Sequence, residues 1–508
     1  MVLSTALSLG VGFVATPWLL RWLGEERFGG YRVAMDWYGY LAFFELGLGG
    51  ALLPLLARAL GRNESGKVRD LLAAGVRGYL GIASAMLLAG LGITAFITRV
   101  IRVSPQNAAD LRWGCLIGLT SLLWLPLASP FRAVTEARQR AYWINLLLMA
   151  QSLIITATAL LLAWLKWGIK GQFIALAVGG AVFNATLIWK GTRQYPGVLG
   201  RAVRQTYDKS ATAELWKLNT PTYVLNLCGR ISLLTDNIVV AAILGPVMVV
   251  PLILTQKLPA MAQAALQGLG TASWAGLAEL HARGEREIFE RRVLELTSLT
   301  STLAVASLLP IAAFNRPFVS LWVGPAHYGG QWMTLFAVLN IFLLSLFSLW
   351  GWVFSGTGEV RRVVRPLVLQ TLFNLVASIL LTKPLGPVGP LIGTFIGFTA
   401  VTAWYFPVQL HRTFGIAIPK LLQAVGRPVV LGVPYVIALW LFERSYRPQG
   451  WFALAGEMLL AGLLYLAMAW WLVLGAEERD LWRIRIKLFR LRPSAAAASA
   501  HTMGVAND

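Results

Sequence analysis

The chain has 508 residues, of which 57% are hydrophobic and only 13% are charged, and its mean hydropathy is +0.65. A soluble protein of this size carries about a quarter charged residues, so the composition excludes a soluble globular protein. The formal net charge of +21 is spread over loops between apolar blocks rather than gathered on one face. This distribution argues against nucleic acid as a partner.

Fourteen apolar blocks approach the length that crosses a bilayer, which is roughly 20 residues of helix. In lipid every backbone amide must be hydrogen-bonded internally, so we expect these blocks to be helices and the fold to be an all-α integral membrane protein. The predicted spans are 2–22, 35–57, 76–98, 113–131, 142–165, 169–189, 218–244, 247–271, 296–314, 332–354, 363–383, 386–410, 428–443 and 452–474.

An internal repeat relates spans 1–6 to spans 7–12, because positions 221 residues apart match repeatedly. Six spans per copy is an even number, so both copies enter the membrane in the same direction and their pseudo-twofold axis lies along the membrane normal. The matches are Leu23-Gly24 with Leu244-Gly245, Gly47-Leu48-Gly49 with Gly268-Leu269-Gly270, Arg62-x-Glu64 with Arg283-x-Glu285, Arg140 with Arg361 and, after a small gap, Gly168-Ile169-Lys170-Gly171 with Gly386-Pro387-Val388-Gly389.

The repeat predicts two six-helix lobes followed by an appended helix pair and a tail. The expected divisions are 1–189 for the N-lobe, 190–217 for a cytoplasmic linker, 218–410 for the C-lobe, 411–474 for spans 13 and 14, and 475–508 for a basic, partly disordered tail. Within the linker, Val198, Leu199, Ala202 and Val203 can form the apolar face of a short helix on the membrane surface.

Basic residues predict the orientation. The loops after even-numbered spans and the C-terminal tail hold 30 Lys and Arg, whereas the loops after odd-numbered spans hold 12. Short loops rich in Lys and Arg stay in the cytoplasm, so we expect a multi-pass protein of the cytoplasmic (inner) membrane with both termini cytoplasmic. The run from Arg483 to Arg492 is expected to bind anionic membrane lipids.

Charged residues within spans are the main functional candidates, because each costs about 2.5–3.5 kcal/mol at mid-membrane. They are Asp36, Glu45, Arg230, Asp236, Lys257 and Glu457. On span 7 an arginine is part of a polar stripe at helical spacing, formed by Asn219, Tyr223, Asn226, Arg230 and Asn237. We expect this stripe to line a cavity, and structural hydrogen bonding between helices is the alternative.

Asp36 and Lys257 are one repeat apart and therefore occupy equivalent places in the two copies. They are predicted to pair across the cleft in one state and to separate in another, which is what a gate requires. The alternative places Asp36 at the outer interface and lets Lys257 reach water. Glu45 and Asp236 are either groups that bind a coupling ion or neutral packing residues.

The segment from Leu19 to Leu72 resembles the polysaccharide-exporter branch of the multidrug/oligosaccharidyl-lipid/polysaccharide (MOP) superfamily, the Wzx-type flippases. Its leucine-glycine and aromatic-glycine pairs are Leu23-Gly24 and Phe28-Gly29, and its acid-x-Gly-x-Gly stretch is Glu45-Leu46-Gly47-Leu48-Gly49. A basic loop, Arg58 to Arg69, follows. The usual acid of this stretch is Asp, so Glu45 is a departure from the pattern.

The resemblance implies two lobes around a cavity that opens alternately to either face. It also implies a cargo, a polyprenyl-diphosphate-linked glycan moved to the outer leaflet for cell-surface polysaccharide synthesis, with other polysaccharide-assembly proteins as further partners. Such a headgroup needs a polar and partly cationic cavity. Arg230 is then the first candidate for contacting the diphosphate, with Tyr223, Asn226, Asn237 and Lys257 beside it.

Two other functions compete with this one. A multidrug cation antiporter of the same superfamily would share the topology, but cavity cations such as Arg230 and Lys257 disfavour a cationic cargo. A membrane glycosyltransferase or polymer ligase needs a long outer loop with catalytic groups, and here the odd-numbered loops are short. We therefore expect a protein that is not an enzyme.

No cofactor or metal is expected from the sequence. It contains no Gly-x-x-x-x-Gly-Lys-Ser/Thr phosphate loop and no Cys or His pairs at metal-binding spacing. Transport is then driven by an ion gradient, by the membrane potential or by consumption of the product, with either H⁺ or Na⁺ as the coupling ion.

Overall fold

The computed structural model describes residues 2–45, 48–204, 220–446, 448, 450–475, 479–480 and 483. In that part of the chain the regular structure is helical. The elements of the first lobe are α1 (Val2–Leu23), α2 (Glu25–Leu41), η1 (Ala42–Glu45), α3 (Leu48–Gly61), α4 (Ser65–Val100), α5 (Pro105–Leu119), η2 (Thr120–Trp124), α6 (Leu125–Ala137), α7 (Ala141–Trp164) and α8 (Gly168–Gln194), and α9 (Val198–Arg204) follows.

The second lobe repeats this order and is followed by two more helices. Its elements are α11 (Thr220–Leu244), η3 (Pro246–Met248), α12 (Val249–Thr255), α13 (Lys257–Ala282), α14 (Arg286–Val323), η4 (Pro325–His327), α15 (Gln331–Gly356), α16 (Arg361–Leu385), η5 (Gly386–Val388), α17 (Gly389–Gly397), the π-helical turn η6 (Phe398–Thr402) and α18 (Ala403–Phe414). The appended pair is α19 (Ile418–Ser445) and α20 (Trp451–Leu472).

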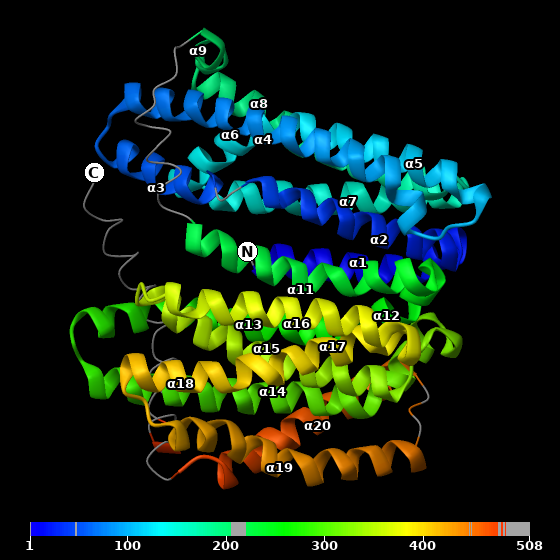
Figure 1. Cartoon of the computed structure of the whole chain (residues 1–508), viewed down its shortest axis with the longest axis vertical. Coiled ribbons are helices and arrows are strands. Elements are labelled where there is room, and N and C mark those ends of the chain that lie inside the picture. Colours follow the sequence, from blue (N-terminus) through cyan, green and yellow to red (C-terminus); the bar gives the residue numbers. More distant parts are fainter. Residues whose placement is uncertain are drawn as a thin grey trace, which may run out of the picture.

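The long helices run side by side, with the first lobe above the second and α19 and α20 below both (Figure 1). Helix α11 lies between the remaining helices of the two lobes. We call the end of the bundle that carries α9 the linker end, and the other end, where α1 is followed by Gly24 and α11 by Gly245, the opposite end.

The helices agree with the predicted spans. In the described part of the chain, nine stretches are long and apolar enough to cross a membrane, or eleven if each of two bent helix pairs is one span. One of the nine, Arg361–Phe414, holds both α16 and α17, which pack against each other and so make two crossings. With the shorter apolar helices Leu7–Leu23 and Leu52–Gly61, the fourteen predicted spans all have a counterpart.

The turns of the two copies have the same backbone geometry. Asn63 and Gly284, one repeat apart, both lie in the left-handed region, at φ 56° and 73°. The next residues, Glu64 and Glu285, have φ/ψ of −82°/70° and −77°/65° and precede α4 and α14. Each of these glutamates donates its backbone N–H to the carbonyl five residues earlier, at 3.0 and 3.2 Å. The repeat found in the sequence is therefore a repeat of structure.

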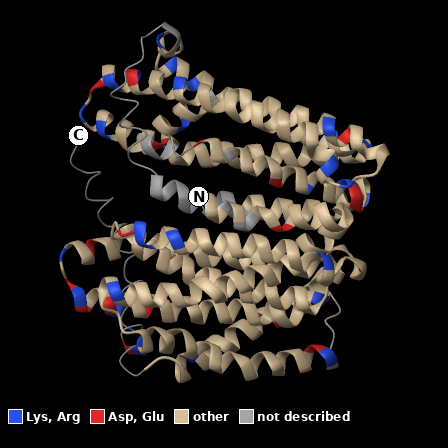
Figure 2. Ribbon diagram, in the orientation of Figure 1, with Lys and Arg blue, Asp and Glu red and all other residues tan. Residues whose placement is uncertain are grey.

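Charged side chains gather at the two ends of the bundle, and the lengths between them are almost free of charge (Figure 2). This is the pattern of a multi-pass membrane protein, because charges at mid-membrane are costly. The basic tail from residue 484 onward lies outside the described residues, as do 205–219 of the linker. The proposed domain boundaries stay a prediction.

Helix α9 forms where the linker was expected to be helical, but it packs on protein rather than on the membrane surface. Val198 and Ala202 are buried, and α9 contacts α4. An ion pair between Arg201 and Asp70, at 3.2 Å, joins the same two helices. The prediction of a surface-bound helix was wrong because α4 extends well beyond the predicted span 76–98 and offers a partner for the apolar face.

The lobes are joined by a buried apolar cluster in the half of the bundle toward the opposite end. It combines Val33 and Phe173 of the first lobe with Val240 and Leu252 of the second. Toward the linker end, the clusters around Leu56 and around Phe406 each belong to one lobe. Among the described residues, the core that the lobes share therefore lies toward the opposite end.

The backbones of the two lobes approach each other closely at Gly29 of α2. A Cβ atom on Gly29 would lie 2.0 Å from the carbonyl oxygen of Pro246 in η3. No side chain fits there, because real Cβ contacts essentially never fall below 3.0 Å. Glycine at this position lets α2 and η3 touch directly.

We predict that Gly29→Ala pushes the lobes apart at the opposite end. Overpacking of this kind costs about 1–3 kcal/mol, so the thermal unfolding midpoint should fall. The distance between spin labels placed at the exposed Gln106 and Lys383, one on each lobe, should increase.

Gly81→Ala is the matched control, because a Cβ on Gly81 meets nothing within 4 Å. It should leave both the midpoint and the label distance unchanged. A Gly29→Ala protein with the wild-type distance would mean that this contact does not set the closure of the lobes.

Candidate functional site

Helix α2 is the element around which the candidate residues gather. It packs against α4, α5 and α8 of its own lobe and against α11, η3 and α12 of the other lobe. It carries an arginine and an aspartate four residues apart, Arg32 and Asp36. A polar helix at the joint between two lobes is suited to contact a polar cargo.

Asp36 and Asn237 meet across the lobe interface, and both were predicted site residues. The side-chain amide of Asn237 in α11 donates to Oδ2 of Asp36 at 2.8 Å. One helical turn further along α2, the Tyr40 hydroxyl lies 2.7 Å from Oγ1 of Thr235. The hydrogen bonds therefore join α2 to α11 directly.

Arg32 is a charged residue of the site that the sequence reasoning missed. The predicted span began at residue 35, which assigned Arg32 to a loop, whereas α2 begins at Glu25. The guanidinium of Arg32 is exposed and interacts electrostatically with both Asp36 and Lys257. The four-residue spacing between Arg32 and Asp36, typical of an ion pair on one helix face, was the available signal.

Lys257 is the first residue of α13 and follows a 52° bend between the α12 and α13 segments. It is partly buried, and Arg32 lies close enough for their two positive charges to interact. Between Asp36 and Lys257, both of them described, the structure records no ion pair, since the partner of Asp36 is Asn237. Their pairing stays a prediction for another conformation.

The backbone of the polar stripe on α11 is helical from Thr220 onward, as expected. The side chains of Tyr223, Asn226 and Arg230 are outside the described part of the structure, and so is the whole of Asn219. Asn237 is the member of the stripe whose contacts are described.

Asp236 lies on α11, one residue before Asn237. Its Oδ1 atom is buried and has no hydrogen-bond partner in the described structure. Helices α16 and α17 pack on α11, and there Asn374 Oδ1 accepts hydrogen bonds from Ser378 Oγ at 2.9 Å and Thr394 Oγ1 at 3.0 Å.

Glu45 is kept apart from these groups. It ends η1, and its carboxylate accepts a hydrogen bond from the Tyr79 hydroxyl of α4 at 2.9 Å. Both residues belong to the first lobe, so this contact lies within that lobe and not between the lobes. Tyr79 is buried. Of the motif that begins at Glu45, residues 46–47 lie outside the described structure.

Two further contacts join the lobes toward the opposite end. The indole N–H of Trp322 donates to the carbonyl of Phe13 at 3.0 Å. Nε2 of His327 lies 3.0 Å from the Glu25 carboxylate, and its Nδ1 lies 2.9 Å from the Val323 carbonyl. Both ring nitrogens of His327 thus lie beside acceptor oxygens. These contacts lie on the same side of the membrane as the shared core.

Solved structures of two kinds of transporter share this fold. "Lipid II flippase MurJ, inward closed conformation" superposes with a TM-score of 0.70 at 14% identity, over 92% of this chain and 98% of that one. An inward-facing multidrug resistance MATE family transporter of the MOP superfamily superposes with a TM-score of 0.61 at 13% identity, over 86% and 94%. The expected fold, two six-helix lobes followed by a helix pair, is confirmed by this similarity.

Sequence relatives define the family. The chain is 22% identical, over 504 residues and 94% of each protein, to the uncharacterized membrane protein EpsK of Bacillus subtilis (strain 168). Residues 1–274, more than half of the chain, match the model of the family described as polysaccharide biosynthesis protein. As the resemblance implied, the fold is shared with a transporter of the MOP superfamily. This chain belongs to the polysaccharide biosynthesis protein family.

Proposed function

We propose that this protein is a flippase that moves a polyprenyl-diphosphate-linked oligosaccharide across the cytoplasmic membrane by alternating access. The observation that carries the proposal is the cationic site at the joint of the lobes, where Arg32 of α2 and Lys257 of α13 lie within electrostatic range of each other. The two positive charges repel each other, and an anion bound between them would offset that repulsion. A diphosphate is such an anion.

The chemistry of the site matches a diphosphate better than a cation. A guanidinium donates two parallel hydrogen bonds to phosphate oxygens, and an ammonium adds a compact charge. Arg32 and Lys257 are positive and Asp36 is negative, so the formal net charge of these three residues is positive. Asp36 also has a partner of its own, Asn237. A multidrug antiporter of the same fold moves cations and would be disfavoured by this charge.

The cargo enters, in this proposal, from the linker end. The described contacts that join the lobes lie toward the opposite end, so in this proposal the lobes part toward the linker end. The excess of Lys and Arg in the loops at the linker end assigns that end to the cytoplasm. Both termini are then cytoplasmic, and the protein acts as a carrier rather than as an enzyme.

We predict that Arg32→Ala and Arg230→Ala each slow translocation of lipid-linked oligosaccharide in proteoliposomes by about tenfold or more. The reason is that a hydrogen bond to a charged group contributes about 1.5–3 kcal/mol. The rate is measured from the fraction of cargo that becomes accessible to an enzyme outside the vesicle.

Arg412→Ala is the control, because Arg412 is an exposed arginine at the linker end of α18, away from α2. It should keep the wild-type rate. Vesicles in which the wild type moves cationic dyes and no lipid-linked sugar would instead establish the multidrug antiporter. Wild-type rates in both arginine variants would remove these residues from the cargo site.

We further propose that Asp36 and Lys257 pair when the lobes rearrange. The exchange variant, Asp36→Lys with Lys257→Asp, should recover part of the transport that each single change abolishes, because it restores one positive and one negative partner. An exchange variant no better than either single variant would refute the pairing. Protein yield and unfolding midpoint, measured for all three variants, separate lost function from lost folding.

Asp236 is proposed as the group that couples transport to an ion gradient, since its buried carboxylate has an oxygen with no described partner. Asp236→Asn should retain downhill movement of cargo but lose the acceleration that an imposed H⁺ or Na⁺ gradient produces in the wild type. The two gradients are applied separately to identify the ion.

Asp70→Asn is the matched control, because Asp70 is an exposed aspartate that pairs with Arg201 at the linker end. It should respond to the gradient like the wild type. An Asp236→Asn protein that still responds would assign Asp236 to packing, which was the alternative from the sequence.

A further inference from the structure

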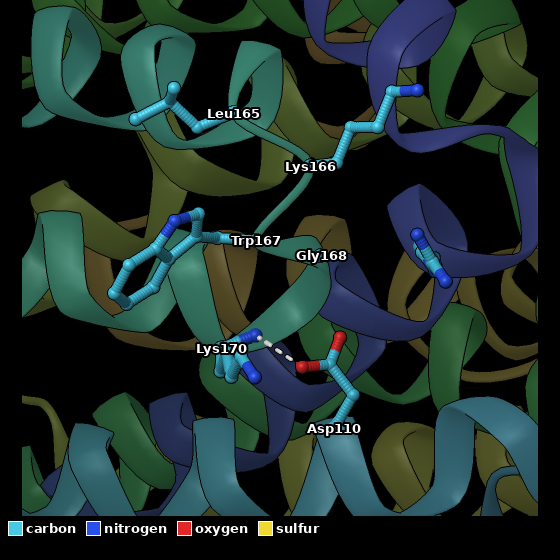
Figure 3. Close-up of a pocket in the computed structure, with 7 residues that line it drawn as sticks. Asp110, Leu165, Lys166, Trp167, Gly168 and Lys170 are labelled. Atoms are coloured by element: carbon cyan, nitrogen blue, oxygen red, sulfur yellow. Dashed lines mark hydrogen bonds between the residues drawn. The ribbon is translucent and has the colours of Figure 1, made fainter.

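A second polar site lies at the opposite end of the first lobe, away from the lobe joint. It is a hollow of about 460 Å³ between the first turn of α2, the first turns of α5 and the turn that joins α7 to α8. Figure 3 shows Lys166 and Asp110 on either side of Gly168, with Trp167 and Lys170 beside them. The function proposed above makes no use of these residues.

The lining of the hollow is cationic. Arg27, Lys166 and Lys170 contribute three positive charges, and Asp110 contributes one negative charge. That carboxylate is already engaged, because its two oxygens accept the backbone N–H groups of Ile169 at 2.5 Å and Lys170 at 3.4 Å. The Asp110 carboxylate therefore caps the N-terminus of α8. The three cations that line the hollow outnumber this one anion.

Specific contacts hold the start of α8 and the Arg27 side chain of α2 in place. Gly168 has φ +63°, and a Cβ there would lie 2.3 Å from Asp110 Oδ2, so glycine is required for the carboxylate to cap α8. The guanidinium of Arg27 donates through Nε to Oδ1 of the buried Asn107 at 2.8 Å. Asn107 in turn donates to Glu26 at 2.8 Å. The Arg27 side chain and the start of α8 are thus held in place around the hollow.

The rim of the hollow is apolar and faces outward. Leu165 and Trp167 are 48% and 46% exposed, and the neighbouring Trp164 is 61% exposed. Tryptophan is enriched at the level of lipid headgroups, where its ring contacts acyl chains and its N–H reaches water. A cationic hollow with an exposed tryptophan and leucine beside it matches the boundary between headgroups and acyl chains.

From this combination we propose that the hollow binds the phosphate headgroup of an anionic membrane lipid in the leaflet at the opposite end. Its volume is that of a pocket for one small headgroup. Basic pockets between membrane helices recognise lipid phosphates by charge-assisted hydrogen bonds. A free phosphate ion would use the same cations but would gain nothing from Trp167 and Leu165, which is why we assign the site to a lipid.

The test is native mass spectrometry of the full chain in detergent, titrated with phosphatidylglycerol, with phosphatidylcholine and, separately, with inorganic phosphate. The wild type should retain phosphatidylglycerol in preference to phosphatidylcholine. Lys166→Gln with Lys170→Gln should weaken phosphatidylglycerol binding by about tenfold, the effect of losing about 1.4 kcal/mol. Trp167→Ala should weaken binding of the lipid and leave any binding of inorganic phosphate unchanged.

The matched control is Arg99→Gln with Lys383→Gln, which removes the same charge from exposed residues at the same end of the bundle but outside the hollow. It should bind phosphatidylglycerol like the wild type. Equal losses in the two double variants would overturn the proposal in favour of general surface charge. Binding of inorganic phosphate that is as strong as lipid binding and indifferent to Trp167→Ala would overturn the assignment to a lipid.

The unfolding midpoint of every variant is measured beside binding. A Lys166→Gln, Lys170→Gln protein that unfolds like the wild type and still binds phosphatidylglycerol normally would also refute the site. The proposal does not depend on the cargo, because the titration contains no lipid-linked sugar.

Discussion

The contact between α2 and the second lobe is the constraint on which the rest of this structure depends. Gly29 lets the backbone of α2 touch η3, and the buried cluster around Val33 and Val240 then closes over the same half of the bundle. This packing places α2 between the lobes. The packing of α2 therefore places Arg32 and Asp36 at the joint between the lobes. A cargo that contacts both lobes would meet these two charges there.

A shared core on one side of the membrane also explains how two stable lobes can move. Each lobe has its own apolar cluster toward the linker end, one around Leu56 and one around Phe406. When the lobes move apart at that end, each cluster stays buried within its own lobe. For the other side to open, the shared apolar core must separate together with polar contacts such as Asn237 with Asp36 and His327 with Glu25. Interfaces of this kind can have two arrangements of similar free energy, which alternating access requires.

The fold was predictable from the sequence to the level of its helices and its repeat, because a bilayer permits few alternatives and because turn residues leave a local signal. Asn63 and Gly284 illustrate this, since both residue types tolerate a positive φ and the two turns have the same geometry. Helix ends at lobe joints were less predictable. Helix α2 begins ten residues before the predicted span, since its first turns are held by polar contacts that hydropathy does not measure, such as those of Glu25 with His327 and of Arg27 with Asn107. Arg32 was missed for that reason.

The site was predictable in part. Asp36, Asn237 and Lys257 were identified by charge and spacing, and the structure brings the first two together. Spacing along one helix cannot show which neighbour a side chain meets, so the contact of Glu45 with Tyr79 inside the first lobe was not foreseen. The hollow beside Gly168 was also not foreseen, because Arg27, Asp110 and Lys166 come from three separate turns.

The equal turns at Asn63 and Gly284 have a consequence for biosynthesis. Each copy holds its own turn, its own long helix after that turn and its own apolar cluster, so the first copy has a complete set of local contacts before α11 leaves the ribosome. Domains that can fold as units do so during synthesis, starting from the N-terminus. The second copy then inserts against a finished neighbour, and Gly29 offers it the docking point for Pro246. Assembly of the transporter is in this way ordered by the chain itself.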